Sequence, residues 1–193
     1  MYAVVEGTSD EQAARAVIRA AGREVTRVHV TKGSAHLDSR LINYWRAAAR
    51  SPWVVFRDTD ARCPVELRAE LLSELPHHNP RFALRLAHSM TEAWLLADPK
   101  NLAAFLGVRI GQVPADPETL PHAKYALLEL CLKSRSRALR RDMVRSATAI
   151  GPLYPLMVNE FASKHWDVAA ASEHAPSLRR AVAAIRAMPE ELE

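Results

Sequence analysis

The first ninety residues alternate short apolar runs with segments in which apolar residues recur every third or fourth position. The apolar runs Tyr2 to Val5 and Trp53 to Phe56 predict buried strands. The β-branched segment Glu24 to Val30 and the segment Arg81 to Ala87 predict two more. The chain therefore starts with four strand-like segments.

Helical spacing between these runs predicts helices over Ser9 to Ala21 with Ser9 as a cap, over Asp38 to Ala49, and over Pro64 to Leu75 with proline in the first turn. Lys32-Gly33-Ser34 reads as a turn. Strands separated by helices of this length indicate an α/β fold, in which a mostly parallel four-stranded sheet has helices on both faces.

The stretch SMTEAWLLADPKNLAAFLG predicts a helix that starts near Thr91, breaks at Asp98-Pro99, resumes to Leu106 and ends at Gly107. Residues 111–121 contain three prolines and read as a loop. We expect this loop to separate a domain over residues 1–110 from a helical extension over residues 122–193 packed on it. The extension has three or four amphipathic helical segments and no convincing strand.

Composition narrows the class of protein. With 193 residues, 49% hydrophobic and 25% charged, the chain is typical of an ordinary globular protein. Its net charge of +4 comes mostly from arginine, which suits phosphate ligands but equally follows from a high-GC genome. Cys63 and Cys131 lack zinc-site spacing, and no run is long enough for a membrane span. We expect a cytoplasmic protein with no membrane association.

Acidic side chains follow the predicted strands. Glu6 and Asp58 stand at the carboxyl ends of the first and third strands, where parallel sheets bind ligands. Asp60 follows Asp58 by two residues, and Asp10 and Glu92 begin the next helices. Because clustered carboxylates repel one another, a chain that gathers them usually neutralises them with a hard cation such as Mg²⁺.

All of these acids except Glu6 also have a simpler explanation. Asp10 and Glu92 stand where acidic residues stabilise helix N-termini, and Asp-x-Asp is common turn chemistry. Capping does not explain Glu6, which ends a strand. The joint occurrence of three acidic segments at one sheet edge favours a metal site.

The motifs VVEGTSD and VVFRDTD resemble the TOPRIM domain shared by topoisomerases, bacterial primases, small ribosomal-RNA-maturing ribonucleases and the overcoming-lysogenization-defect (OLD) nucleases. The segments EAWLLADP, GPLYP and PSLRRAV are similar to a stand-alone TOPRIM-like bacterial family, often thought to act beside an ATPase of the ABC or AAA type. The resemblance covers about residues 1–100, and more weakly the whole chain. Many TOPRIM sequences place a glycine soon after the second Asp, whereas this chain reads Ala61-Arg62-Cys63-Pro64, which favours the nuclease-like branch.

The resemblance implies a Mg²⁺ or Mn²⁺ site with two ions. The first ion would be held by Glu6, Asp58 and Asp60, and the second by Asp10 and Glu92. Hydrolysis of a phosphodiester in DNA or RNA would follow, with an activated water as nucleophile. The chain is short for the tyrosine domain of a topoisomerase or the template-binding module of a primase.

Basic residues could serve such a reaction. Lys32, at the end of the second strand, and Lys164 are candidate catalytic lysines, with Lys100 as a third, against the simpler reading of exposed surface lysines. The stretch LKSRSRALRRDMVR, if helical, gathers a basic face for a nucleic-acid backbone, made of Lys133, Arg137, Arg140, Arg141 and Arg145. A solvated or partner-facing helix explains the same pattern.

Three functions remain open at this stage. The first is a metal-dependent endonuclease, an effector in phage defence or repair that acts with a separate ATPase. The second is a regulatory or nucleic-acid-binding subunit whose TOPRIM site is degenerate. The third is a sugar-nucleotide transferase using Asp58-Thr59-Asp60, which leaves Glu6-Gly7 unexplained. Apolar residues in the extension also suggest a homo-oligomer or an ATPase-contacting surface.

Overall fold

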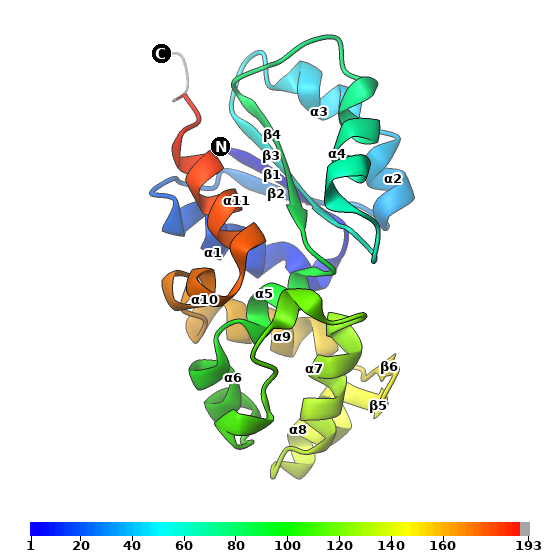
Figure 1. Ribbon diagram of the computed structural model, residues 1–193, viewed down its shortest axis with the longest axis vertical. Coiled ribbons are helices and arrows are strands. Elements are labelled where there is room, and N and C mark those ends of the chain that lie inside the picture. Colours follow the sequence, from blue (N-terminus) through cyan, green and yellow to red (C-terminus); the bar gives the residue numbers. More distant parts are fainter. Residues whose placement is uncertain (190–193) are drawn as a thin grey trace.

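A four-stranded parallel sheet forms the centre of the computed structural model, which describes residues 1–189 (Figure 1). The strands are β1 (Tyr2–Val5), β2 (Arg27–Val30), β3 (Trp53–Asp58) and β4 (Phe82–Ala87). Their order is β2-β1-β3-β4, and each neighbouring pair is parallel. The α/β class and the parallel sheet predicted from the sequence are confirmed.

Alternate residues of the central strands enter two separate apolar layers. Val4 and Val55 pack with leucines of α2 (Ser34–Asp38), α3 (Leu41–Ala47) and α4 (Pro64–Ser73). Val5 and Phe56 face the opposite layer, which includes α1 (Glu11–Ala20) and α11 (Pro176–Arg186). Burial on both faces explains why these strands read as continuous apolar runs rather than as alternating ones.

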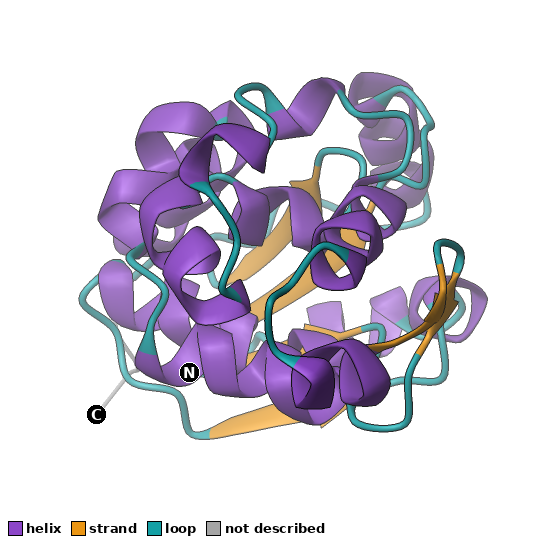
Figure 2. Ribbon diagram, turned by 90° about the horizontal axis from the view of Figure 1, so that it is seen from below, coloured by secondary structure: helices purple, strands orange, loops and turns teal. Residues whose placement is uncertain are grey.

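The remaining helices continue from the carboxyl end of β4, where α5 begins. They are α5 (Thr91–Leu96), α6 (Pro99–Leu106), α7 (Ala123–Leu132), α8 (Arg137–Met143), α9 (Tyr154–Lys164) and α10 (Val168–His174). In Figure 1, α6, α7 and α8 lie below the sheet, and α10 and α11 return the chain to it. Figure 2 shows the sheet lying inside a shell of helices.

The break between α5 and α6 follows the sequence closely. Asp98 ends the first helix and caps the second, its Oδ1 accepting a hydrogen bond from the Asn101 N–H at 3.2 Å. Gly107 ends α6 in the left-handed conformation with φ of 65°. The predicted helix, break and stop are all confirmed.

Three predictions about local structure are wrong. The expected helix over Asp38 to Ala49 is two helices, and the first already begins at Ser34, after Gly33 with φ of 93°. Ser9 does not cap α1; a 3-10 helix, η1 (Thr8–Asp10), precedes it, and Asp10 Oδ2 accepts a hydrogen bond from the Gly7 N–H at 2.9 Å. The loop over residues 111–121 contains parts of two short 3-10 helices, η2 (Ile110–Gln112) and η3 (Pro117–Thr119).

The C-terminal region also differs from expectation. Over residues 122–189, five helices, α7 to α11, are present rather than three or four, together with an antiparallel hairpin of β5 (Val144–Ser146) and β6 (Ala149–Ile150). The strands are two and three residues long and outside any apolar run, so periodicity gives no signal for them.

One apolar core joins the two segments that the sequence separates at residues 111–121. A single cluster of buried side chains runs from Met1 and Ala3 through Leu102 and Leu127 to Ile185 and Met188. The helices of the extension therefore complete the sheet's own layer. Over residues 1–189, no helix is both long and apolar enough to cross a bilayer.

Candidate metal centre

Carboxylates from three strand ends gather at one edge of the sheet. Glu6 follows β1, Asp58 ends β3, and Glu92 lies in the first turn of α5 after β4. Glu6 Oε1 accepts a hydrogen bond from the Asp58 N–H at 2.7 Å, so the first two acids are directly linked. Asp10 comes from η1, beside the same strand end.

Asp58 holds the end of β3 to the start of α5. Its Oδ1 accepts hydrogen bonds from the N–H and the hydroxyl of Thr91, both at 2.9 Å. Because Glu92 is the next residue, this clamp fixes the third carboxylate relative to the sheet. The parallel register, which pairs Asp58 with Ala87, brings the ends of β3 and β4 level.

Arg57 lies on the opposite side of β3 from Asp58, because successive side chains of a strand alternate between faces. Arg57 is 5% exposed, and its guanidinium pairs with Asp38 at 3.1 Å, with Glu6 at 3.3 Å and with Asp60 at 2.9 Å. The guanidinium therefore gathers a second set of acids, and Glu6 belongs to both sets.

Asp60, like Glu6, is a predicted ligand that pairs with Arg57. Its backbone has φ of 48°, and its carboxylate pairs with Arg57 while staying 45% exposed. The acids whose charges act on Asp58 are Asp10, Glu92 and Glu6. The second Asp of the Asp-x-Asp motif thus stands apart from the first.

Glu92 is the most deeply buried acid of the site, with 2% of its surface exposed. Its Oε1 accepts a hydrogen bond from the Tyr154 hydroxyl at 2.8 Å and lies 3.3 Å from Lys124 Nζ. Its Oε2 is buried and has no hydrogen-bond partner among the described residues. A buried carboxylate oxygen without a donor is costly, which makes it a position where a cation would be stabilising.

Burial and neighbouring carboxylates raise the pKa values of three of the acids. Burial, and then the charge of Glu92, raises the pKa of Asp10 from 3.8 to about 7. Burial, followed by Asp10 and Glu92, holds the pKa of Asp58 well above its ordinary value. Burial also raises the pKa of Glu6, against the Asp58 N–H and Arg57. We call Asp10, Asp58 and Glu92, with Lys124 and Tyr154, the acidic cluster.

Lys124 is the cation of the acidic cluster. Burial lowers its pKa, but Glu92, Asp58 and Asp10 more than offset this, so the pKa lies above the ordinary value. One lysine faces the three carboxylates of Asp10, Asp58 and Glu92, which is an excess of acid. Such a set fits a divalent cation by its chemistry, since oxygen donors and uncompensated charge are what Mg²⁺ and Mn²⁺ require.

The side chains are not arranged as a finished metal site. Within residues 1–189, no group of three His, Cys, Asp or Glu side chains is placed so that it could hold an ion together. The hydrogen bonds above explain this, because Asp10, Asp58 and Glu92 each turn oxygens toward donors of the protein. Binding an ion therefore requires rotation of these carboxylates.

The lysines expected from the sequence lie elsewhere. Lys32 is exposed, in the loop after β2, where the neighbouring Gly33 N–H donates to the Glu6 carbonyl oxygen at 3.1 Å. Lys164 ends α9 and pairs with Glu160 at 3.1 Å, about 15 Å along the helix axis from Tyr154. Lys100 is exposed on α6. Lys164 is thus not brought to the acidic cluster, and the contact between the loop of Lys32 and Glu6 is made by the backbone of Gly33.

The basic stripe predicted on one helix face is interrupted, so that prediction is wrong. α7 ends at Leu132, just before Lys133, and Ser136 Oγ caps the separate helix α8 by accepting from the Leu139 N–H at 3.2 Å. Arg140 bonds the Ser134 carbonyl oxygen, and Arg141 pairs with Asp142 at 2.6 Å. Arg145 lies in β5 rather than on the helix with Arg137.

Three residues of this centre are not predicted by the sequence analysis, although two of them have a recognisable signal in the sequence. Lys124 shares a helical face with the buried Leu127 and Leu128, an unusual place for a lysine. Arg57 is the one charged residue before Asp58 in the strand WVVFRD, and such a position predicts an ion pair. Tyr154 lies within GPLYP but carries no signal that distinguishes it from a core tyrosine.

Comparison with known proteins returned no matching family, no matching curated protein and no matching solved structure.

Proposed function

We propose that this chain is a divalent-metal-dependent nuclease of TOPRIM-like type, acting on phosphodiesters of DNA or RNA. The observation that carries the proposal is the excess of carboxylate at the joined ends of β1, β3 and β4: Asp10, Asp58 and Glu92 with one lysine, and Glu92 Oε2 buried without a donor. The motifs VVEGTSD and VVFRDTD, whose acids fall at these strand ends, support the TOPRIM assignment.

Asp10, Asp58 and Glu92 would hold the ion, with Glu6 at the margin. A divalent cation supplies positive charge for phosphoryl oxygens and lowers the pKa of water. Glu6, whose carboxylate is bonded to the Asp58 N–H, orients the end of β3. Lys124 adds positive charge beside the same carboxylates, and Tyr154 holds Glu92 in place.

The ion pair between Arg57 and Asp60 limits how many metal ions the site can hold. Asp60, proposed as a ligand of the first ion, is paired with Arg57, so a second ion needs that pair to open. We propose one ion on the acidic cluster as the ground state and a second only with substrate. Isothermal titration with Mn²⁺ distinguishes one site from two.

The decisive test is cleavage of labelled single-stranded and duplex DNA and RNA with Mg²⁺ or Mn²⁺, alone and with a partner ATPase. Asp58→Asn should abolish cleavage and Mn²⁺ binding. It should still fold, because Asn imitates the protonated form that burial favours and still presents an oxygen to Thr91. Glu129→Gln is the matched control: this acid is exposed on α7, the helix that carries Lys124.

A second function is favoured by a separate observation. The protein supplies its own cations to both sets of acids, Lys124 to Glu92 and Arg57 to Asp60, as a degenerate site would. In that case the chain would be a regulatory or nucleic-acid-binding subunit. Nucleic-acid binding without Mn²⁺ uptake and without cleavage would replace the nuclease proposal with this one.

The wider assignments are proposals that rest on the family resemblance alone. They are a partner ATPase of the ABC or AAA type, a role in phage defence or repair, and self-association. Co-purification with an ATPase, followed by ATP-dependent cleavage, is the result that would support the first two.

A further inference from the structure

The outer edge of β4 lines a groove. β4 ends the sheet order, and α4 and α11 stand on either side of it (Figure 1). Two cavities of about 690 and 500 Å³ lie along this edge and share three lining residues, Arg68, Leu84 and Arg85. We call the two together the β4 groove. It runs from Trp45 and Pro80 at one end to His88 and Ser177 at the other.

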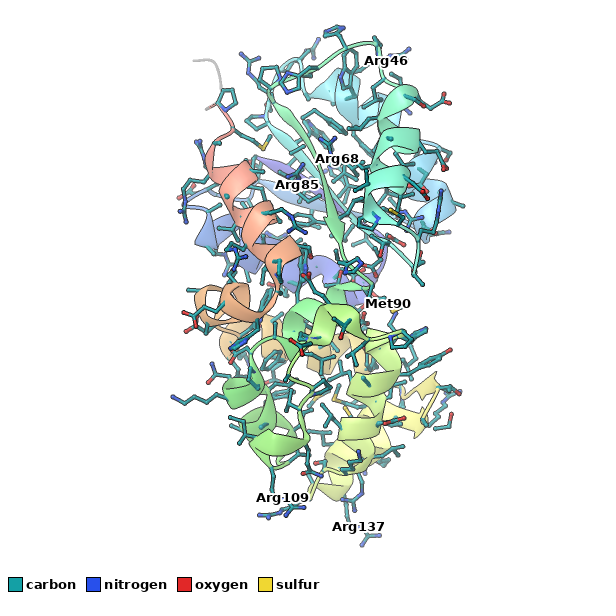
Figure 3. The ribbon with its side chains drawn as sticks, viewed as in Figure 1. Arg46, Arg68, Arg85, Met90, Arg109 and Arg137 are labelled. Carbon is teal, nitrogen blue, oxygen red and sulfur yellow. The ribbon has the colours of Figure 1, made fainter. Side chains whose placement is uncertain are left out.

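Arginines line the β4 groove without acids to balance them. Arg68 comes from α4, Arg85 from β4 and Arg180 from α11, and no Asp or Glu within residues 1–189 lines either cavity. Figure 3 shows Arg68 and Arg85 over the middle of β4. None of the three arginines forms an ion pair within the described part of the chain.

Arg85 is the groove arginine whose charge is least compensated by its surroundings. It is half-buried, and its Nε donates only to the carbonyl oxygen of the preceding residue, Leu84, at 2.7 Å. Burial, and then the charges of Arg68 and Arg180, lowers its pKa. A desolvated guanidinium with like charges around it is destabilising unless an anion binds there. The groove is therefore built for a negatively charged ligand.

Aromatic and other apolar side chains line the groove beside the arginines. Trp45, Phe82 and Pro80 line the end near the start of β4, and Trp45 meets the ring of His77 edge-on at a centroid distance of 4.8 Å. On the α11 side, Ala181, Ala184 and Ala187 present small side chains at helical spacing, which leaves the groove open. A group of guanidinium side chains beside an aromatic and apolar wall matches the phosphates and unpaired bases of a nucleic-acid strand.

The groove leads to the acidic cluster. Its far end is lined by His88, whose N–H donates to Ser177 Oγ at 3.2 Å. Thr91, which clamps Asp58, follows three residues later, so the two are within about 10 Å along the chain. Figure 3 places Met90, one of the two residues between them, beyond the end of β4.

We infer that the β4 groove binds a single strand of nucleic acid, with its phosphates on Arg68, Arg85 and Arg180, and leads that strand toward the acidic cluster. A single strand is specified because only unpaired bases can reach the apolar wall beside Trp45 and Phe82. The single strand would be the substrate of the proposed nuclease. The path of the strand toward the acidic cluster rests on that proposed function, whereas binding of the strand in the groove does not.

The test measures binding without catalysis. Fluorescence anisotropy of a labelled single-stranded 12-nucleotide DNA and RNA is recorded in EDTA as salt is varied. Arg85→Gln and Arg68→Gln should each weaken binding about three- to tenfold and should each reduce the slope of log K against log salt by about 0.7. Arg85→Lys should retain most of the binding, and it guards against a folding defect in the neutral variant. The control is Arg109→Gln, whose arginine lies at the opposite end of the molecule (Figure 3).

The inference would be overturned if Arg85→Gln bound the single strand with unchanged affinity, or if duplex bound as tightly as the single strand. It would also be overturned if a poly-glutamate peptide competed as well as unlabelled single strand, because the ligand would then be an acidic protein segment. Failure here is separable from failure of the nuclease. Asp58→Asn should bind the strand normally yet not cleave it, whereas groove variants should lose binding. If Arg85→Gln cleaves nucleic acid as well as wild type, strand binding in the β4 groove is contradicted, whereas the proposed nuclease activity is not.

Discussion

Asp60 lies beside Arg57 rather than beside Asp58, with its Oδ2 2.9 Å from Arg57 Nη1. The same guanidinium holds Asp38 and Glu6, so one buried cation sets the positions of three carboxylates around the end of β3. This pairing decides which acids are free for an ion.

Arg57→Ala should therefore be strongly destabilising. It would leave Glu6 and Asp38 without their cation, and losing one partner of a buried ion pair costs about 3–5 kcal/mol. We expect the lower end, about 3 kcal/mol, because Asp38 and Asp60 reach solvent. Urea unfolding gives the value. Arg62→Ala, which removes an exposed pair with Glu70, should leave the midpoint unchanged; an equal loss in both variants would contradict the prediction.

Stability without metal should depend on pH through Asp10. Its pKa is raised from 3.8 to about 7 in the folded protein, so between about pH 4 and pH 7 the folded state binds more protons than the unfolded state. The contribution of Asp10 to the free energy of unfolding therefore falls as pH rises through this window and is constant above it. Asp58 and Glu6, whose pKa values are also raised, act in the same direction.

Asp10→Asn isolates this effect. The stability of the variant relative to wild type should increase from pH 4 to pH 7 in EDTA, measured by denaturant unfolding at each pH. Glu129→Gln should follow wild type throughout. A constant difference between Asp10→Asn and wild type across the window would show that Asp10 is not held in this environment.

The Tyr154 hydroxyl should contribute to stability through Glu92. Tyr154→Phe removes the 2.8 Å donor to a buried carboxylate oxygen, and hydrogen bonds to charged groups contribute about 1.5–3 kcal/mol. We expect a loss of about 2 kcal/mol. Tyr125→Phe, on the exposed side of α7, is the matched control. In a double-mutant cycle, Tyr154→Phe should cost much less stability in a Glu92→Gln background than in wild type. Additive losses of stability would contradict an interaction between Tyr154 and Glu92.

Gly151 should tolerate no side chain. A Cβ there would lie 2.5 Å from the Asp142 carbonyl oxygen and 2.5 Å from the Val144 nitrogen, both backbone atoms that cannot rotate away. Gly151→Ala should cost about 3 kcal/mol or more, at the upper end for overpacking. Gly111→Ala, where an added Cβ would lie more than 4 Å from every described residue except its chain neighbours, should unfold at nearly the wild-type temperature in calorimetry.

The two central strands, β1 and β3, could be predicted from the sequence because they are covered on both faces and read as continuous apolar runs, as in Val4-Val5 and Val54-Val55. The gathering of Glu6, Asp58 and Glu92 follows in turn from parallel strands, whose carboxyl ends meet at one edge. Helix ends that depend on a single residue, such as Asp98 and Gly107, could also be predicted from the sequence.

What could not be predicted depends on partners far apart in the chain. Asp60 was grouped with Asp58 by spacing, but a backbone with φ of 48° turns it to Arg57. Lys124 and Tyr154 reach Glu92 from 32 and 62 residues away, and no local pattern encodes such contacts. The basic stripe failed because Ser136 caps a new helix, a local signal that competes with charge periodicity.

The return of α10 and α11 to the sheet bears on how the protein is made. The layer beside α1 stays open until residues 176–186 pack against it, and Arg23 then binds the carbonyl oxygens of Arg186 and Met188. A nascent chain that has exposed all four strands to solvent still lacks one wall of its core. The acidic cluster itself takes its last side chain, Tyr154, from α9, so it can be completed only after residue 154 has left the ribosome.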